Sequence, residues 1–172
     1  MRRSIVIIAL MLPAAPASAL PCLWRPFSGC SFSFVSPEYA ARPVQPLDKE
    51  KALEAVNAFR TANGLKPLVL DERLCQAAAM QSKAQAERSW IGHYGPDGST
   101  AKDRAARAGY PAKIASENVA SGQKSFADAL QFWEQSSGHR TNLLRSNVAA
   151  IGVAMAKTKS GHPYWTLVLA GQ

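Results

Sequence analysis

The chain has 172 residues, of which 47% are hydrophobic, and it carries a formal net charge of +8 at pH 7. This length suits one domain with one hydrophobic core. The positive charges are scattered among acidic residues rather than gathered into a basic run, so the composition favours a mixed, solvated surface and argues against nucleic acid as a partner.

Residues 1–19 are predicted to be an export signal rather than part of the fold. Arg2 and Arg3 precede an uncharged apolar run over residues 5–12, and Ala17-Ser18-Ala19 forms a small-residue cleavage site. The apolar run is shorter than the roughly 20 residues that a membrane span needs, and no later segment is apolar enough. We therefore expect cleavage after Ala19, no transmembrane segment in the mature chain, and a secreted or periplasmic bacterial protein.

Residues 20–46 are predicted to form an N-terminal arm. The arm holds five of the eleven prolines and is rich in aromatic side chains, which is unusual for a pure linker. We expect it to lie against the domain, and the alternation over residues 31–35 favours an added edge strand.

The three cysteines leave several pairings open in an oxidising compartment. Cys22 and Cys30 are spaced for a small closed loop, and lipidation of Cys22 is an alternative that the residues before it fit poorly. Cys75 lies among alanine and leucine on an expected helix and is interpreted as a buried small hydrophobic residue. A disulfide from Cys75 to either of the other two also stays open.

The folded domain is predicted to cover residues 47–172, and its first half is mainly helical. Helix-capping aspartates at 48 and 71 precede amphipathic segments over residues 49–62 and 72–88. A short extended piece joins these two helices. A glycine-containing loop over residues 89–98 follows, and a third helix is expected over residues 101–108.

The second half of the domain mixes helix and strand. A short segment over residues 114–121 carries Glu117, and Ser125 with Asp128 has the spacing of a capping box before a helix. Residues 148–156 and 164–170 read as two strands joined by a turn. Because the strands are few and poorly interleaved with helices, we expect an α+β domain with a small antiparallel sheet and a C-terminal β-hairpin.

Residues 133–144, with the sequence Trp-Glu-Gln-Ser-Ser-Gly-His-Arg-Thr-Asn-Leu-Leu, are the most informative stretch. A helix that ends in Ser-Ser-Gly delivers the imidazole of His139 at a helix-to-loop transition. A carboxylate from a preceding loop, Glu117, can meet it there. The chain has three histidines, so this placement indicates a site.

Several motifs together resemble the CAP superfamily of cysteine-rich secretory, antigen 5 and pathogenesis-related proteins, in its short bacterial form. They occur in family order: Asn57-x-x-Arg60, Leu65-x-Pro67-Leu68, Asp71-x-x-Leu74-x-x-Ala77-Ala78, His93, Arg107-Ala108-Gly109-Tyr110, Glu117-Asn118-Val119-Ala120, Trp133-x-x-Ser136-x-Gly138-His139-Arg140, Ile151-Gly152-Val153 and Tyr164-Trp165. The resemblance covers residues 48–170. It implies a three-layer α-β-α sandwich with one cavity between helices and loops.

The resemblance also implies which residues form the cleft. His93, Glu117 and His139 match the family's cavity-lining residues, whereas Ser136 stands where many eukaryotic members have a second glutamate. Ser116 occupies a position that is often glycine. The expected cleft residues are His93, Tyr94, Glu117, Asn118, Ser136, His139 and Arg140.

The chemistry of this cleft has three interpretations. Two imidazoles and one carboxylate, from His93, His139 and Glu117, would be the ligands of an open zinc site. Alternatively, Glu117 holds both histidines in a structural polar network. A hydrolase would use His139 or Glu117 as general base on water or on a nearby serine, although no residue is assigned as catalytic and the sequence leaves enzymatic activity open.

The first functional hypothesis is a non-catalytic CAP module that binds a small hydrophobic or lipid ligand, or an envelope or host protein, through this cleft. The alternative is a metal-assisted hydrolase or peptidase that uses His93, Glu117 and His139. A third hypothesis assigns partner binding to the aromatic arm over residues 20–46.

Overall fold

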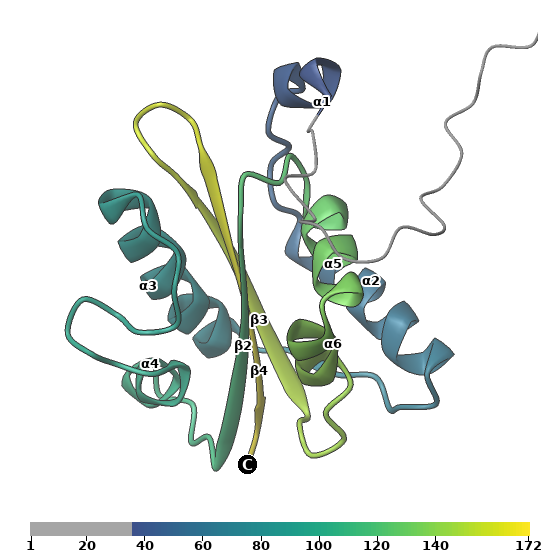
Figure 1. Cartoon of the computed structure of the whole chain (residues 1–172). Coiled ribbons are helices and arrows are strands. Elements are labelled where there is room, and N and C mark those ends of the chain that lie inside the picture. Colours follow the sequence, from purple (N-terminus) through teal and green to yellow (C-terminus); the bar gives the residue numbers. More distant parts are fainter. Residues whose placement is uncertain (1–35) are drawn as a thin grey trace, which may run out of the picture. The chain divides into compact units, whose positions relative to one another are not determined.

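A four-stranded sheet lies at the centre of the domain, with helices on both of its faces (Figure 1). The computed structural model describes residues 36–172, and residues 37–172 form one compact unit. The export signal, its cleavage site, the Cys22–Cys30 loop and the strand over residues 31–35 fall outside the described residues and stay predictions.

The elements follow one another as helices and strands of one α+β domain. In chain order they are α1 (Pro37–Ala41), α2 (Lys49–Ala62), β1 (Val69–Leu70), α3 (Glu72–Arg88), α4 (Ala101–Arg107), β2 (Ile114–Ser121), α5 (Phe126–Gln135), α6 (Ser137–Leu143), β3 (Ala150–Lys157) and β4 (Pro163–Gly171).

The helix starts are set by local capping chemistry, as the sequence predicts. Asp48 accepts a hydrogen bond from the Lys51 amide at the start of α2, and Asp71 accepts one from the Arg73 amide at the start of α3. Thr100 forms a full capping box at α4, and Ser125 caps α5. Such side-chain acceptors satisfy amide groups that a helix leaves without a backbone partner.

The sheet has the strand order β1-β3-β4-β2. The predicted C-terminal hairpin is β3 and β4, which pair antiparallel from Ala150 opposite Ala170 to Lys157 opposite Pro163. β2 pairs antiparallel with the other side of β4, and the two-residue β1 adds a short parallel pairing with β3. β2 is therefore an edge strand, and the expected loop position of Glu117 is wrong.

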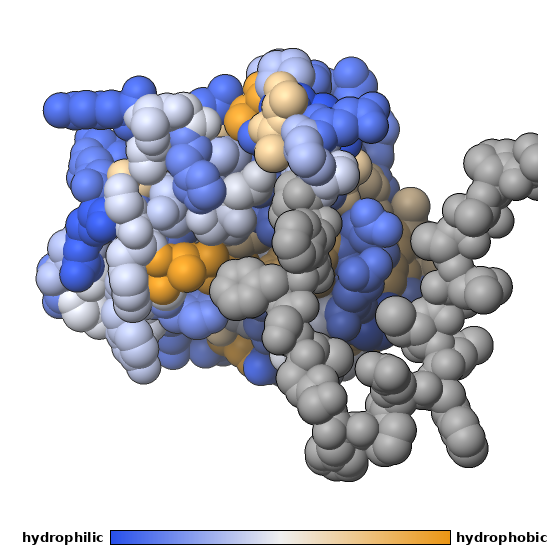
Figure 2. All heavy atoms as spheres, turned by 45° about the horizontal axis from the view of Figure 1, so that its top comes forward, coloured by the Kyte–Doolittle hydropathy of each residue, from blue (hydrophilic) through white to orange (hydrophobic). Residues whose placement is uncertain are grey.

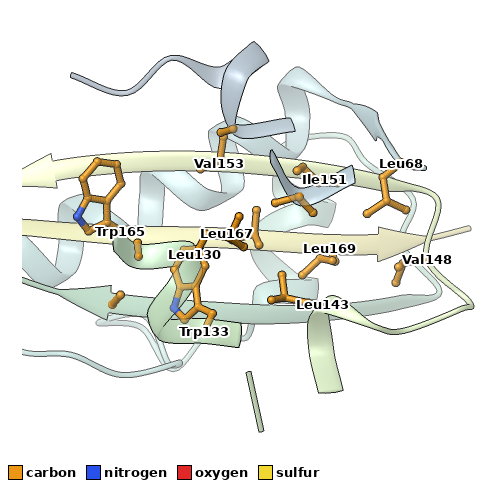
Figure 3. Packing of buried hydrophobic residues seen from close by; sticks show 14 residues of the cluster. Leu68, Leu130, Trp133, Leu143, Val148, Ile151, Val153, Trp165, Leu167 and Leu169 are labelled. Atoms are coloured by element: carbon orange, nitrogen blue, oxygen red, sulfur yellow. The ribbon is translucent and has the colours of Figure 1, made fainter. Parts of the chain in front are cut away.

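Each face of the sheet has its own core. One face carries large side chains that pack against α2, α5 and α6, among them Ile151, Val153, Trp165, Leu167 and Leu169, and α5 contributes Trp133 to the same core (Figure 3). The other face carries mainly small residues beneath α3 and α4, such as Ala150, Ala154 and Ala170. The predicted three-layer α-β-α architecture is confirmed.

Small residues on the second face allow α3 to approach the sheet closely. A Cβ added at Gly152 would lie 2.0 Å from the backbone carbon of Leu74. Because protein interiors are close-packed, a side chain at residue 152 would fit only if the whole of α3 moved away from the sheet. The alanine-rich sequence of α3 thus allows the helix to pack closely on the sheet. Cys75 on this helix carries a free, buried thiol, and the burial raises the pKa of that thiol.

The end of the predicted N-terminal arm, residues 37–46, contacts the rest of the domain. The Gln45 amide donates to the Lys124 carbonyl at 2.7 Å, and the Lys124 amide donates to the Tyr39 hydroxyl at 3.2 Å. Val44 and Leu47 pack against the large-residue core. Hydrogen bonds therefore join this stretch to the segment before α5, and apolar contacts join it to the core.

The surface seen in Figure 2 is mostly hydrophilic, with apolar residues in small separate groups. The large hydrophobic residues that are exposed in the described part are Val69, Met80, Trp90, Ile91, Tyr94 and Phe132. No helix within residues 36–172 is long and apolar enough to cross a membrane.

Candidate functional site

Glu117 is the centre of the candidate site, and β2 holds it in place. The strand pairs along its whole length with β4, which sets Glu117 opposite Val168. Its side chain is only 3% exposed. A buried carboxylate is costly unless it is paired and hydrogen-bonded, so its partners decide what it can do.

Arg104 on α4 is the first partner of Glu117. Its Nη2 donates to Glu117 Oε2 at 2.5 Å, and its side chain is 2% exposed. The same guanidinium donates to the Ser99 carbonyl at 2.6 Å and to the His93 carbonyl at 3.3 Å. One buried cation therefore ties together β2, the start of α4 and the loop that carries His93.

Arg104 does not stand out in the sequence. Helix 101–107 contains Lys102, Arg104 and Arg107, and these residues look alike without tertiary context. The local sequence holds no signal that separates them, because Arg104 and Arg107 are each followed by alanine, yet Arg104 is buried and Arg107 is exposed.

His93 is the second partner of Glu117. Its Nδ1 lies 3.1 Å from Glu117 Oε1, and the hydrogen bond to that carboxylate raises the pKa of His93, although burial opposes the rise. The carboxylate accepts, so Nδ1 carries the proton and Nε2 is left for a ligand. With 54% of its side chain exposed, His93 lies at the surface.

His139 approaches the site from the other side of β2. It lies on α6, which begins at Ser137, so the expected helix-to-loop position is wrong: the Ser-Ser-Gly sequence opens a new helix instead of ending one. Its Nδ1 is buried without a hydrogen-bond partner, and its ring lies 5.7 Å from that of Phe132. Burial, and then the charge of His93, lower the pKa of His139.

Amide side chains join α6 to β2. Asn118 is fully buried and donates to the His139 carbonyl at 3.0 Å. Asn142 donates to the Asn118 side chain at 2.9 Å and to the Glu117 carbonyl at 3.2 Å. Asn118 therefore fixes the backbone of His139.

Two other expected cleft residues lie elsewhere. Ser136 is the residue before α6 and makes no capping hydrogen bond through its side chain. Arg140 donates to Asn63 at 3.1 Å and stacks 4.9 Å from the ring centre of Phe59, which places it against α2. Both residues therefore belong to the layer formed by α2, α5 and α6.

A pocket of about 240 Å³ opens beside His93 and Glu117. Its lining residues come from the loop before α4, the first turn of α4 and the first half of β2: His93, Tyr94, Thr100, Ala101, Lys102, Ala115, Ser116 and Glu117. The pocket thus unites three of the predicted cleft residues, His93, Tyr94 and Glu117. Asn118, Ser136, His139 and Arg140 are not part of its lining.

The residues present do not form a ready three-ligand zinc centre. Both oxygens of Glu117 are engaged, one by the buried Arg104 guanidinium and one by His93. Within residues 36–172, no three His, Cys, Asp or Glu side chains come together as metal ligands. What remains for a metal is imidazole nitrogen from His93 and His139, and a zinc titration tests the metal interpretation.

Comparison with known proteins supports the fold and the motifs. The model of the cysteine-rich secretory protein family, CAP, matches residues 53–169. The uncharacterized protein YkwD of Bacillus subtilis (strain 168) is 34% identical over 124 residues, which cover 72% of this chain and 47% of that protein. The chain therefore spans about half the length of this relative.

Solved structures share the fold. An extracellular protein containing a SCP domain from Bacillus anthracis str. Ames is 24% identical, with a TM-score of 0.64 over 74% of this chain and 45% of that one. An outer surface protein from Borrelia burgdorferi is 19% identical, with a TM-score of 0.66 over 75% of this chain and 98% of that one. With the match over residues 53–169, the α-β-α layers and the ordered motifs, this chain belongs to the CAP family of cysteine-rich secretory proteins.

Proposed function

We propose that this chain is an exported CAP-domain module that binds a ligand through the pocket at His93 and Glu117 without catalysing a reaction on it. The observation that carries the proposal is the state of Glu117. Arg104 and His93 each donate to one of its two oxygens, and the side chain is only 3% exposed, whereas a general base must come within reach of the substrate proton. The carboxylate thus fixes the pocket wall.

The pocket's dimensions support a small ligand or a small part of a larger one. Its volume of about 240 Å³ is below the roughly 300–1,000 Å³ of pockets that enclose drug-sized molecules. Tyr94 lines it, is 63% exposed, and offers a ring for an apolar part of the ligand. A small hydrophobic molecule, a lipid end group or a side chain of an envelope or host protein are the classes to test.

Export is supported by the sequence of residues 1–19 and by the kind of protein that shares the fold. The N-terminus has the charged, apolar and small-residue regions of a cleaved signal. Two fold relatives are described as extracellular and as an outer surface protein. We therefore place the mature chain outside the cytoplasm, as a secreted or periplasmic protein.

The test is a fragment screen by NMR on the mature chain from Leu20. Small apolar, polar neutral, acidic and short-chain lipid fragments are added in turn, and backbone amide shifts are followed. We expect shifts centred on His93, Tyr94 and Ser116, with the fragments recovered intact. Tyr94→Ala should weaken the response, and Trp90→Ala, outside the pocket lining, is the matched control.

Two outcomes would overturn the proposal. If no fragment class moves the amides of the pocket, the pocket is not a ligand site. If ester or peptide fragments are cleaved by the wild-type chain and not by His93→Ala, the hydrolase hypothesis replaces the binding one.

A further inference from the structure

The loop that carries His93 runs back along α3. Ser89, the residue that ends this helix, has a left-handed backbone with a φ of 49°, and the chain reverses direction there. Residue 92 thereby comes beside the C-terminal half of α3, where Gln81 and Gln85 lie on the same face of the helix, four residues apart. Both glutamines are 1% exposed, and neither belongs to the lining of the pocket at His93.

The two glutamine side chains converge on one carbonyl group of this loop. Gln81 Nε2 donates to the Gly92 carbonyl oxygen at 2.6 Å, and Gln85 Nε2 donates to the same oxygen at 2.7 Å. A carbonyl oxygen has two lone pairs, so the two glutamines use its full capacity as an acceptor. Because a carbonyl only accepts, each side-chain amide must turn its NH2 group toward Gly92 and its own oxygen away from it.

This arrangement costs stability. The Oε1 atoms of Gln81 and Gln85 are buried and have no hydrogen-bond partner within the described part of the chain. Buried polar atoms nearly always have a partner, and an unpaired one is destabilising. Methionine has a side chain of similar length and fills buried space without this cost. Packing of α3 against the loop therefore does not account for two glutamines at these positions.

The hydrogen bonds to Gly92 complete a set that holds His93 from both sides. The Gly92 carbonyl belongs to the peptide group that ends at the nitrogen of His93, and the His93 carbonyl accepts from Arg104 Nη2 at 3.3 Å. Peptide groups are planar, so holding the two groups on either side of the His93 Cα fixes the φ and ψ of this residue. Glu117 Oε1 then lies 3.1 Å from Nδ1 of the imidazole.

We propose that Gln81 and Gln85 are positioning residues for His93, which hold the peptide group before it so that the imidazole meets Glu117 and keeps its place in the pocket wall. The inference deepens the proposed binding function and rests on it. Since neither glutamine lines this pocket, they act on the ligand only through the loop. Their unpaired oxygens are the cost in stability of this fixed position.

The experiment compares Gln81→Met and Gln85→Met in the mature chain. Each substitution keeps the length of the side chain and removes one donor to Gly92 together with one unpaired oxygen. We expect both variants to melt at or above the wild-type temperature, because the remaining glutamine still donates to Gly92. Gln76→Met is the matched control, because Gln76 is exposed on the same helix.

Two NMR signals report the position of His93 without a ligand. At a pH where the ring is neutral, the imidazole nitrogen shifts of the wild type should show the tautomer protonated at Nδ1, since Glu117 accepts from that nitrogen. In Gln81→Met and Gln85→Met, we expect a larger share of the tautomer protonated at Nε2. The carbonyl carbon of Gly92 should also change its shift as it loses a donor. Gln76→Met should leave both signals unchanged.

Phenol is the probe for binding, because it is a small ring for a pocket of about 240 Å³ that Tyr94 lines. Its affinity, followed by the amide shifts of the pocket, should fall about fivefold in Gln81→Met and in Gln85→Met. This factor corresponds to one net hydrogen bond of about 1 kcal/mol. Gln76→Met should bind phenol as the wild type does.

Three outcomes decide between the possible roles. A lower melting temperature with unchanged tautomer and carbonyl shift would show that the glutamines only pack, and would overturn the proposal. Equal phenol affinity in the wild type and in all three methionine variants would overturn it as well. If no fragment moves the pocket amides of the wild type, the binding function fails, and the tautomer and the carbonyl shift still decide whether the glutamines position His93.

Discussion

Arg104 and Glu117 form an ion pair that is almost completely shielded from water. Nη2 and Oε2 are 2.5 Å apart, and the two side chains are 2% and 3% exposed. The pair joins α4 to the edge strand β2, and Glu117 in turn orients His93 through Nδ1. The buried ion pair therefore fixes the relative positions of three segments of the candidate site, which are α4, β2 and the loop that carries His93.

Removing one partner of this pair should be costly. Arg104→Met would leave the Glu117 carboxylate buried and short of a counter-charge, for which losses of about 3–5 kcal/mol are typical. We expect a fall of that size in the free energy of unfolding, measured by urea denaturation. Arg107→Met on the same helix is the matched control, because the Arg107–Asp97 pair is exposed and should matter little. Equal effects of the two substitutions would contradict the central role of Arg104.

The two histidines near β2 should have opposite effects on stability as the pH changes. The hydrogen bond to Glu117 raises the pKa of His93 above 6.5. Its stabilising contribution is complete below the unfolded pKa and is lost as the pH rises through the folded pKa. We expect the stability gap between the wild-type chain and His93→Gln to narrow as the pH rises above 6.5.

His139 should act in the other direction. Burial, followed by the charge of His93, lowers its pKa below 6.5. The unfolded chain then binds more protons than the folded one, so this histidine costs stability as the pH falls through 6.5. NMR titration of the two imidazoles should give a higher pKa for His93 than for His139, and Glu117→Gln should narrow the gap. Coincident titration curves in the wild type would refute the assignment.

Close packing of α3 on the sheet should make Gly152 intolerant of any side chain. A Cβ there would meet backbone atoms of Leu74 and Cys75 at 2.0–2.4 Å, and overpacking of a core costs about 1–3 kcal/mol. Gly152→Ala should lower the free energy of unfolding by at least this amount. Gly138→Ala, where nothing lies within 4 Å of the added Cβ, is the control and should be neutral or slightly stabilising.

Zinc should have little effect on the wild-type chain. Arg104 occupies one oxygen of Glu117 and would repel a divalent cation placed beside it, leaving imidazole as the available ligand. We expect equimolar zinc to leave the melting temperature of the wild-type chain unchanged. The substitutions His93→Ala and His139→Ala should each change the melting temperature without added zinc. Stoichiometric zinc uptake that is lost in both variants would instead establish a metal site and favour the metal-assisted alternative.

The sequence by itself determined the elements whose signals are local. Capping at Asp48, Asp71, Thr100 and Ser125 is chemistry within one turn of helix, so these helix starts are readable from a few neighbouring residues. The C-terminal hairpin follows from strand pattern and turn in the same way. Ordered motifs identified the family, and with it the layers.

Only the tertiary structure decided the arrangement of the site. β2 is a strand because β4 pairs with it from more than 40 residues away, and the sequence around Glu117 carries no strand pattern strong enough to show this. No neighbouring residue shows that Arg104 is buried or that it meets Glu117, since the exposed Arg107 is also followed by alanine. Pairing between distant segments determines which charges are buried together, and burial determines which of them can still meet a ligand.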